Sequence, residues 1–162
     1  MRESRRLTAK DPAGTRAIGA ALAEALLATD PAAALLVTLT GELGAGKTTL
    51  VAGLLERLGH PGPVRSPTYA LVESYALAGW RLHHCDLYRL RDPDELDDLG
   101  LRDLLAPGAV VLIEWPERAG DRLPPPDLAL QLSYADAGRE LTLRAATATG
   151  AGLLDRLRLE AA

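Results

Sequence analysis

The fold of this chain is decided by one loop, whose sequence is Gly41-Glu42-Leu43-Gly44-Ala45-Gly46-Lys47-Thr48. It satisfies the P-loop pattern, in which two glycines separated by four other residues are followed by Lys and then by Ser or Thr. Glycines let backbone N–H groups turn inward around phosphates, and the amino end of the following helix adds a favourable dipole. In such a loop Lys47 would supply charge to the β- and γ-phosphates, and the Thr48 hydroxyl could ligate Mg²⁺. The loop therefore predicts a nucleotide-phosphate site.

The segments on either side of the loop have the patterns that this mechanism requires. Residues 35–39 are a short apolar run, as in a fully buried parallel strand, and they end at the loop. After the loop, apolar residues recur at helical spacing from Leu50 to Leu58, and Gly59 stops that helix. Further back, Asp11 and Pro12 are typical of a helix start, so we expect a helix over residues 12–28.

The rest of the chain mixes strand and helix patterns. Two extended runs joined by a two-residue turn, 69–77 and 80–87, indicate an antiparallel hairpin. The remaining expected elements are a helix start at 93–99, a buried strand at 109–114, alternating strands near 127–133 and 139–145, and a helix near 151–159. We therefore expect one α/β domain over residues 1–162, a three-layer fold of the P-loop NTPase type. Its mixed sheet would have a parallel centre, with helices on both faces.

Composition excludes several classes of function. The formal charge is −4 and no extended basic run is present, so autonomous nucleic-acid binding is not expected. The single cysteine, Cys85, has no partner for an internal disulfide, which suits a reducing cytosol. The basic amino terminus lacks a following apolar run, and the most apolar stretch, residues 17–39, is interrupted by charges and a proline. We expect a cytoplasmic protein with no membrane partner.

A P-loop also needs an acidic group for the metal's water shell and a polar group that orients the attacking water. Two carboxylates end apolar strands in this sequence, Asp86 and Glu114. A solvated strand end or a helix cap is the alternative for each alone. Beside the P-loop they become candidate site residues, and we assign Glu114 to the metal because its strand is the more buried in pattern. Which of the two carboxylates lies nearer the metal stays open.

The sequence allows two interpretations of several other residues. The segment Ser66-Pro67-Thr68 stands where NTPases keep a loop that orders around the γ-phosphate, although an ordinary proline turn also explains it. Trp115 could be a residue of the site or a packing residue. His83 and His84 could simply alternate between the two faces of a strand. No guanine-selecting Asn-Lys-x-Asp follows the P-loop, so ATP is expected rather than GTP.

Four motifs in order and spacing resemble the bacterial TsaE (YjeE) family, the ATPase component of the machinery that makes threonylcarbamoyladenosine in tRNA. They are Gly41 to Leu50, Ser66-Pro67-Thr68-Tyr69, His84-Cys85-Asp86-Leu87-Tyr88-Arg89 and Ile113-Glu114-Trp115-Pro116-Glu117. The resemblance covers almost the whole chain. Tyr69 and Cys85 stand where that family often has Phe, and both keep an apolar body.

The resemblance implies an ATP-dependent switch that docks onto the threonylcarbamoyl-transferase and its non-catalytic paralogue (TsaD and TsaB type). It would meet tRNA only through that complex. It implies ATP and Mg²⁺ as cofactors, Lys47, Asp86 and Glu114 as catalytic residues, and Thr48 and Glu114 as the metal site. The nucleotide-binding residues that it implies are Glu42, Leu43, Gly44, Ala45, Gly46, Lys47, Thr48, Thr49, Ser66, Thr68 and Trp115.

An arginine from a partner can accelerate phosphoryl transfer by orders of magnitude, so we expect slow hydrolysis by the chain alone. Arg89 is the best internal candidate for an electrostatic role, with a surface ion pair or partner contact equally open.

Two other functions remain possible from the sequence. A small-molecule kinase of the shikimate-kinase type would need an acceptor site and an arginine lid, for which only Arg118 and Arg122 are available. A non-hydrolysing nucleotide-binding module would bind ATP without turnover.

Overall fold

The computed structural model describes residues 3–30, 32, 34–65, 67 and 71–159. In chain order its elements are β1 (Glu3–Ala9), α1 (Pro12–Leu27), β2 (Leu35–Thr40), α2 (Lys47–Arg57), β3 (Val72–Leu77), β4 (Trp80–Asp86), α3 (Glu95–Leu99), α4 (Leu101–Leu104), β5 (Ala109–Glu114), the 3₁₀ helix η1 (Pro116–Ala119), β6 (Leu128–Ala135), β7 (Gly138–Ala145) and α5 (Ala148–Arg156).

The strands form one seven-stranded sheet in the order β1-β7-β6-β2-β5-β4-β3. Strand β2 runs parallel to both of its neighbours, β5 and β6, and β4 runs parallel to β5. The remaining pairs, β1 with β7, β7 with β6 and β3 with β4, are antiparallel. Because β2, β4 and β5 are parallel, their carboxyl ends lie at one edge of the sheet, and the loop from β2 to α2 leaves from that edge.

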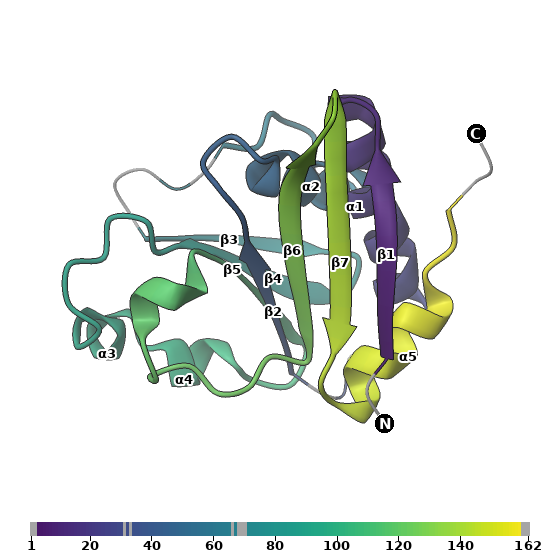
Figure 1. Ribbon diagram of the computed structural model, residues 1–162. Coiled ribbons are helices and arrows are strands. Elements are labelled where there is room, and N and C mark those ends of the chain that lie inside the picture. The colour runs from purple at the N-terminus through teal and green to yellow at the C-terminus, as the bar shows by residue number, and fades with distance from the viewer. Residues whose placement is uncertain (1–2, 31, 33, 66, 68–70, 160–162) are drawn as a thin grey trace.

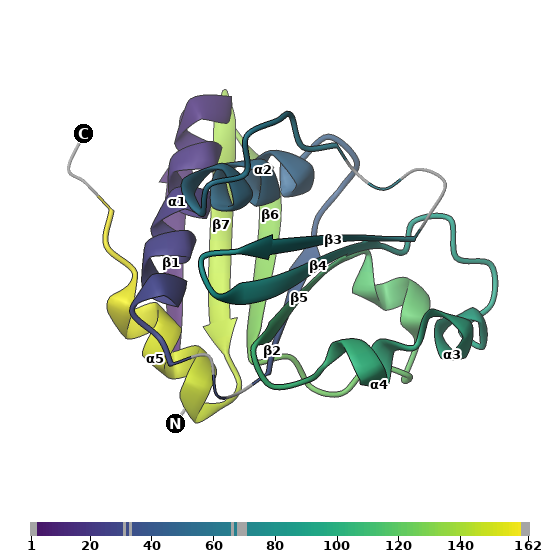
Figure 2. The ribbon, with the colours of Figure 1, turned by 180° about the vertical axis from the view of Figure 1, so that it is seen from behind.

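Helices cover both faces of the sheet. Helices α1, α2 and α5 bury the larger apolar cluster, which includes Leu39, Leu54 and Leu112. The short helices α3, α4 and η1 cover a smaller cluster on the other face, around Leu36, Val111 and Ile113. Figure 1 shows α1 and α2 behind strands β6 and β7, and Figure 2 shows the same helices from their own side. The expected α/β class, with its parallel centre and two helical layers, is confirmed.

Local chemistry explains several of the predicted boundaries. Helix α1 begins where Asp11 accepts a hydrogen bond from the Gly14 N–H with its side chain, as an N-cap does. The β3–β4 hairpin turns at Ala78 and Gly79, whose φ angles of 53° and 84° are those of a type I′ turn. Both features follow from side-chain or turn chemistry that is local in the sequence.

Elements that depend on distant contacts were predicted less well. Strand β1 was not expected, because its alternation is short and charged. It pairs only with β7, and Arg5 donates to the Leu157 carbonyl at 2.7 Å just after α5. The last helix spans 148–156 rather than 151–159, because Thr147 is its N-cap and donates to Asp127 at 2.7 Å. The acidic segment at 93–99 forms the short helix α3, and α4 follows it.

Helices α1 and α2 touch backbone to backbone at two glycines. A Cβ added at Gly19 would lie 2.1 Å from the Leu50 carbonyl oxygen, and one at Gly53 would lie 2.2 Å from that of Arg16. No side chain can occupy such a gap, so the glycines set how closely the two helices cross. Since α2 carries the end of the P-loop, this crossing also positions the loop over the sheet.

We predict that Gly19→Ala lowers the free energy of unfolding by about 2–3 kcal/mol, because the new methyl group meets backbone that cannot move aside. The measurement is urea unfolding followed by circular dichroism. Gly152→Ala in α5 is the matched control, since its Cβ would meet only the flexible end of the Arg156 side chain. That control should be neutral or stabilise by about 0.5–1 kcal/mol. Equal effects of both substitutions would contradict the prediction.

Among the described residues, no helix combines the length and the apolar character needed to cross the hydrocarbon core of a membrane.

Cys85 is a buried free thiol, and burial raises its pKa to about 12. A thiol with that pKa is inert at neutral pH, so Cys85 belongs to the core and not to the chemistry of the site.

Candidate functional site

The loop between β2 and α2 leaves the amino end of α2 open. Gly44 and Gly46 have φ angles of 81° and 107°, which residues with a Cβ rarely adopt. Gly46 is the N-cap of α2, and no side chain caps the first turn of that helix. Unpaired N–H groups at the start of a helix attract anions, so this end of α2 is suited to phosphate oxygens.

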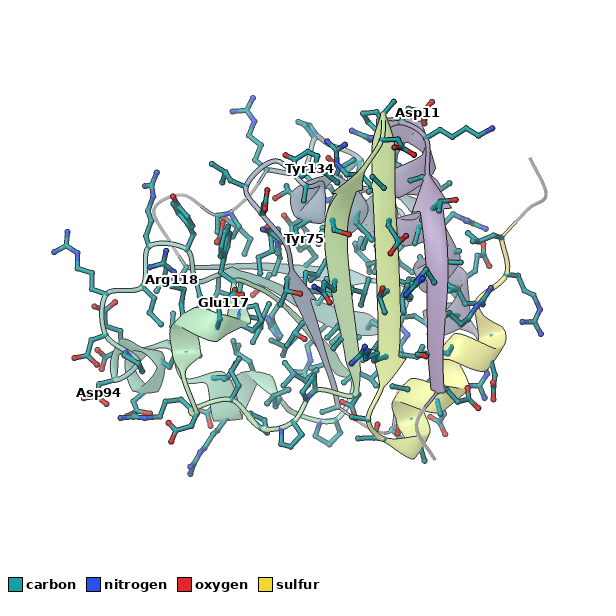
Figure 3. All side chains as sticks on the ribbon, in the orientation of Figure 1. Asp11, Tyr75, Asp94, Glu117, Arg118 and Tyr134 are labelled. Carbon is teal, nitrogen blue, oxygen red and sulfur yellow. The ribbon has the colours of Figure 1, made fainter. Side chains whose placement is uncertain are left out.

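The β6–β7 hairpin holds the outer side of the loop. The Tyr134 hydroxyl donates to the Leu43 carbonyl at 2.9 Å. The Arg139 guanidinium donates to the carbonyls of Ala45 and Gly44 at 3.2 and 3.3 Å, and it lies 4.2 Å from the centroid of the Tyr134 ring. Three consecutive carbonyls are thus tied outward, which favours the conformation that turns N–H groups inward. Figure 3 shows Tyr134 on β6 at the loop end of the sheet.

Lys47 is held inside the loop. Its ammonium donates to the Gly41 carbonyl and to the Glu42 carbonyl, the latter at 3.3 Å. It also lies 3.8 Å from the centroid of the Trp115 ring, and the residue is only 5% exposed. Burial lowers the pKa of Lys47 below its usual range, and nearby carboxylates, Glu114 foremost, oppose this shift. The ammonium therefore rests on carbonyls and an aromatic ring that a stronger anionic partner would replace.

Two carboxylates stand opposite the start of α2. Glu114 and Asp86 end neighbouring parallel strands and are paired in register. The Thr48 hydroxyl lies 3.2 and 3.1 Å from the two carboxylate oxygens of Glu114, which is buried. Asp86 accepts a hydrogen bond from the Tyr88 N–H at 3.0 Å. The same pair of strand ends that the sequence singled out therefore faces the P-loop helix.

Aromatic side chains form the remaining wall. Trp115 follows β5 directly with φ of 59°, a left-handed conformation that is rare for a bulky residue. Its ring lies 5.0 Å from that of Tyr88, and the Arg118 guanidinium lies 5.4 Å from the Tyr88 ring. Glu117 and Arg118 lie together on η1, away from the β6–β7 hairpin (Figure 3). Arg122 pairs instead with Asp94 and Asp97, so it does not form the lid that a kinase would need.

These walls enclose a phosphate pocket of about 210 Å³ beside the loop. Its lining consists of Leu43, Gly44, Gly46, Lys47, Thr48, Thr49, Asp86, Tyr88, Glu114 and Trp115. A second pocket of about 270 Å³ shares Gly44, Gly46 and Thr49 with it and extends between the β1–α1 turn and the β6–β7 turn. Lys10, Asp11, Thr15 and Arg139 are its other polar lining residues. The two pockets lie on either side of the P-loop.

The structure brings together all of the predicted site residues that it describes. Glu42 and Leu43 contribute carbonyls, since the Leu43 side chain is 70% exposed and the Glu42 side chain also faces solvent. Ser66 and Thr68 lie outside the described residues, so their predicted role stays a prediction. The sequence did not indicate Tyr134 or Arg139, because nothing local places the β6–β7 hairpin beside the loop. His84 stands in one of the four motifs and alternates with His83 along its strand, but the sequence does not predict its contact with Glu114.

Magnesium suits the donor set at this place. Thr48 and Glu114 offer hard oxygen atoms about 3 Å apart at the mouth of the phosphate pocket. Among the described residues, no group of three or more His, Cys, Asp or Glu could hold a metal by itself. Mg²⁺ in phosphate sites takes one or two protein oxygens and completes its shell with water and phosphate, so a larger protein cluster is not required.

Comparison with known proteins agrees with this site. A family model described as threonylcarbamoyl adenosine biosynthesis protein TsaE matches residues 9–141. The tRNA threonylcarbamoyladenosine biosynthesis protein TsaE of Haemophilus influenzae is 45% identical over 136 residues, 84% of this chain and 86% of that protein. Its counterpart in Streptomyces coelicolor is 40% identical over 140 residues, 85% of this chain and 90% of that protein.

A solved structure extends the likeness to the fold. The crystal structure of YdiB from Bacillus subtilis has a TM-score of 0.76 at 28% identity and covers 97% of this chain and 95% of its own. The fold and the loop thus define an α/β protein of the P-loop class. Since the family model and the relatives match most of its length, the chain belongs to the TsaE family.

We predict that Tyr134→Phe raises the dissociation constant for ATP about three- to tenfold, because one hydrogen bond that orients the loop is lost. The measurement is isothermal titration calorimetry with Mg²⁺ present. Tyr134 is half exposed, so the melting temperature should not change. Tyr75→Phe is the matched control. Tyr75 lies on β3, an outermost strand of the sheet, and this variant should bind ATP like the parent. Unchanged affinity in Tyr134→Phe would show that the hairpin does not shape the loop.

Proposed function

We propose that this chain is the ATP-binding and ATP-hydrolysing switch subunit that threonylcarbamoyladenosine modification of tRNA position 37 requires. Membership of the TsaE family supports the pathway, since relatives of this chain are named for the biosynthesis of that nucleoside. Its partners are the threonylcarbamoyl-transferase subunit and the non-catalytic paralogue, of TsaD and TsaB type. The formal net charge is −4 and the sequence has no extended basic run, so we infer that the chain meets tRNA only through the complex. The site of action would be the cytoplasm.

The observation that carries the proposal is the contact of Thr48 with Glu114 at the uncapped start of α2. Phosphate oxygens bind the free N–H groups there, and Lys47 leaves its carbonyl partners to neutralise the β- and γ-phosphates. Thr48 and Glu114 are the residues that would hold Mg²⁺. When bound, the ion would supply charge stabilisation to the transferring phosphoryl group, and Asp86 is placed to orient the attacking water.

The nucleoside half of ATP lies in the second pocket. The β- and γ-phosphates, which would bind the metal, face Glu114. The α-phosphate then lies on the opposite side, near Thr49. The second pocket begins at that point and shares Gly44, Gly46 and Thr49 with the first. Its volume of about 270 Å³ and its polar rim suit a base and a ribose. Asp11, labelled in Figure 3, stands on that rim.

We predict that Ala137→Trp, at the rim of the second pocket, weakens ATP binding about tenfold or more by filling the nucleoside space. Binding of inorganic tripolyphosphate, which has no nucleoside, should be unchanged. Lys47→Ala is the complementary control and should weaken both ligands. The measurement is competition of each ligand against a fluorescent ATP analogue. Equal loss of ATP and tripolyphosphate in Ala137→Trp would place the nucleoside elsewhere.

Hydrolysis by the isolated chain should be slow. Lys47 is the only cationic side chain among the described residues that line the phosphate pocket. Two residues that line the pocket, Leu43 and Tyr88, are 70% and 41% exposed, so solvent reaches it on that side. Phosphoryl transfer gains most from positioned charge in a dry site, and a partner can supply both. Hydrolysis would then reset the complex between cycles of modification.

We predict that adding the transferase pair from the same organism raises steady-state ATP hydrolysis about tenfold or more. Lys47→Ala should abolish the stimulated rate because it removes the charge from the phosphates. Glu114→Ala separates the two remaining models: it should abolish tRNA modification if hydrolysis is needed, and leave it largely intact if the chain acts by binding alone. Unstimulated hydrolysis in a confirmed complex would contradict the gated switch.

A further inference from the structure

His84 and His83 are adjacent on β4 and point to opposite faces of the sheet. His83 is half buried, and its Nδ1 lies 2.8 Å from the Ser74 hydroxyl on β3. His84 is fully buried, and its Nε2 lies 2.5 Å from a carboxylate oxygen of Glu114. In register His84 is paired with Leu112, two residues before Glu114 on β5, so the contact is a diagonal one between neighbouring strands.

The surroundings of the two ring nitrogens of His84 determine which of them carries the proton. Its Nδ1 is buried and has no hydrogen-bond partner among the described residues. A proton on Nδ1 would be a buried unpaired donor, which costs about 1–3 kcal/mol. A proton on Nε2 has the Glu114 carboxylate as its acceptor. The ring therefore donates from Nε2 to Glu114.

Packing alone gives no reason for a histidine at this place. Two of its neighbours on the same face, Leu82 and Leu112, belong to the main core. Glu73 on β3 is its partner in register, and Asp86 and Glu114 follow toward the strand ends. Burying an imidazole there costs free energy unless its polar atoms are paired, and only one of them is. An apolar side chain would fill the space without that cost. The bond to Glu114 is the one contribution that an apolar side chain could not make.

We propose that His84 is a positioning residue for Glu114 in ATP hydrolysis. This role of His84 rests on the function proposed above. Glu114 accepts hydrogen bonds from the Thr48 hydroxyl on one side and from His84 on the other. If the Thr48 oxygen served as an Mg²⁺ ligand, His84 would be the donor that still fixes the carboxylate. Outer partners that fix metal-site ligands in this way change affinity or activity about 10–100-fold when they are removed.

The test compares substitutions that keep or remove the donor at the position of Nε2. A glutamine reaches as far as His Nε2 and can donate from its amide, whereas an asparagine reaches only as far as Nδ1 and a leucine cannot donate. In the complex with the transferase pair, His84→Leu and His84→Asn should lower kcat about 10–100-fold with KM for ATP nearly unchanged. His84→Gln should stay within about fivefold of the parent.

Two controls separate positioning from folding. His83→Leu and His83→Gln change the same residue type one position away and should leave kcat unchanged. In a Glu114→Ala background, His84→Leu should cost nothing further, because its effect passes through the carboxylate. Equal loss in His84→Gln and His84→Leu, or an additive effect in the double variant, would overturn the proposal.

A second measurement keeps the inference independent of hydrolysis. The Mg²⁺ concentration that gives half of the maximal gain in ATP affinity should rise about tenfold in His84→Leu and recover in His84→Gln. This titration uses binding alone, so it applies even if the parent does not hydrolyse ATP in the complex. An Mg²⁺ dependence that is the same in the parent and in His84→Leu would overturn the role of His84 while leaving ATP binding intact.

Discussion

The rest of this structure depends on keeping the first turn of α2 uncapped and open to an anion. Helix starts are ordinarily closed by a Ser, Thr, Asp or Asn side chain, as Asp11 and Thr147 close α1 and α5 here. At α2 a glycine takes that place, so the N–H groups stay available. The loop also turns three carbonyls outward, and these accept hydrogen bonds from the β6–β7 hairpin. A segment more than 80 residues later along the chain thus maintains the anion site.

The parallel centre of the sheet supplies the acidic half of the site. Strands β2, β5 and β4 end at one edge, so the P-loop and the two terminal carboxylates meet although they are far apart in sequence. The close crossing of α1 and α2 at glycines then fixes how α2 sits above that edge. Backbone geometry, rather than any single side chain, brings Thr48 to Glu114.

Among the described residues, the site contains three ionisable side chains that are almost fully buried, Lys47, Glu114 and His84. Each would destabilise the fold if it were unpaired, and each is paired with another group of the site. Lys47 rests on carbonyls and on Trp115, while Glu114 links the P-loop helix to the interior of the sheet through His84. This arrangement holds the reactive groups close to their working positions and leaves the ammonium with partners that phosphate can replace.

Local chemistry in the sequence by itself determined the P-loop, the helix that follows it, the type I′ hairpin and the two strands that end in Asp86 and Glu114. These features follow from glycine conformation, N-caps and runs of apolar residues, all of which act over a few residues. Only the tertiary structure decided the strand order, and with it the contacts of Tyr134 and Arg139 with the loop and of His84 with Glu114. Strand β1 and the start of α5 were also decided there, through their pairing with β7 and with Asp127. Such contacts join residues that are distant along the chain, and no local pattern states which distant strand becomes a neighbour.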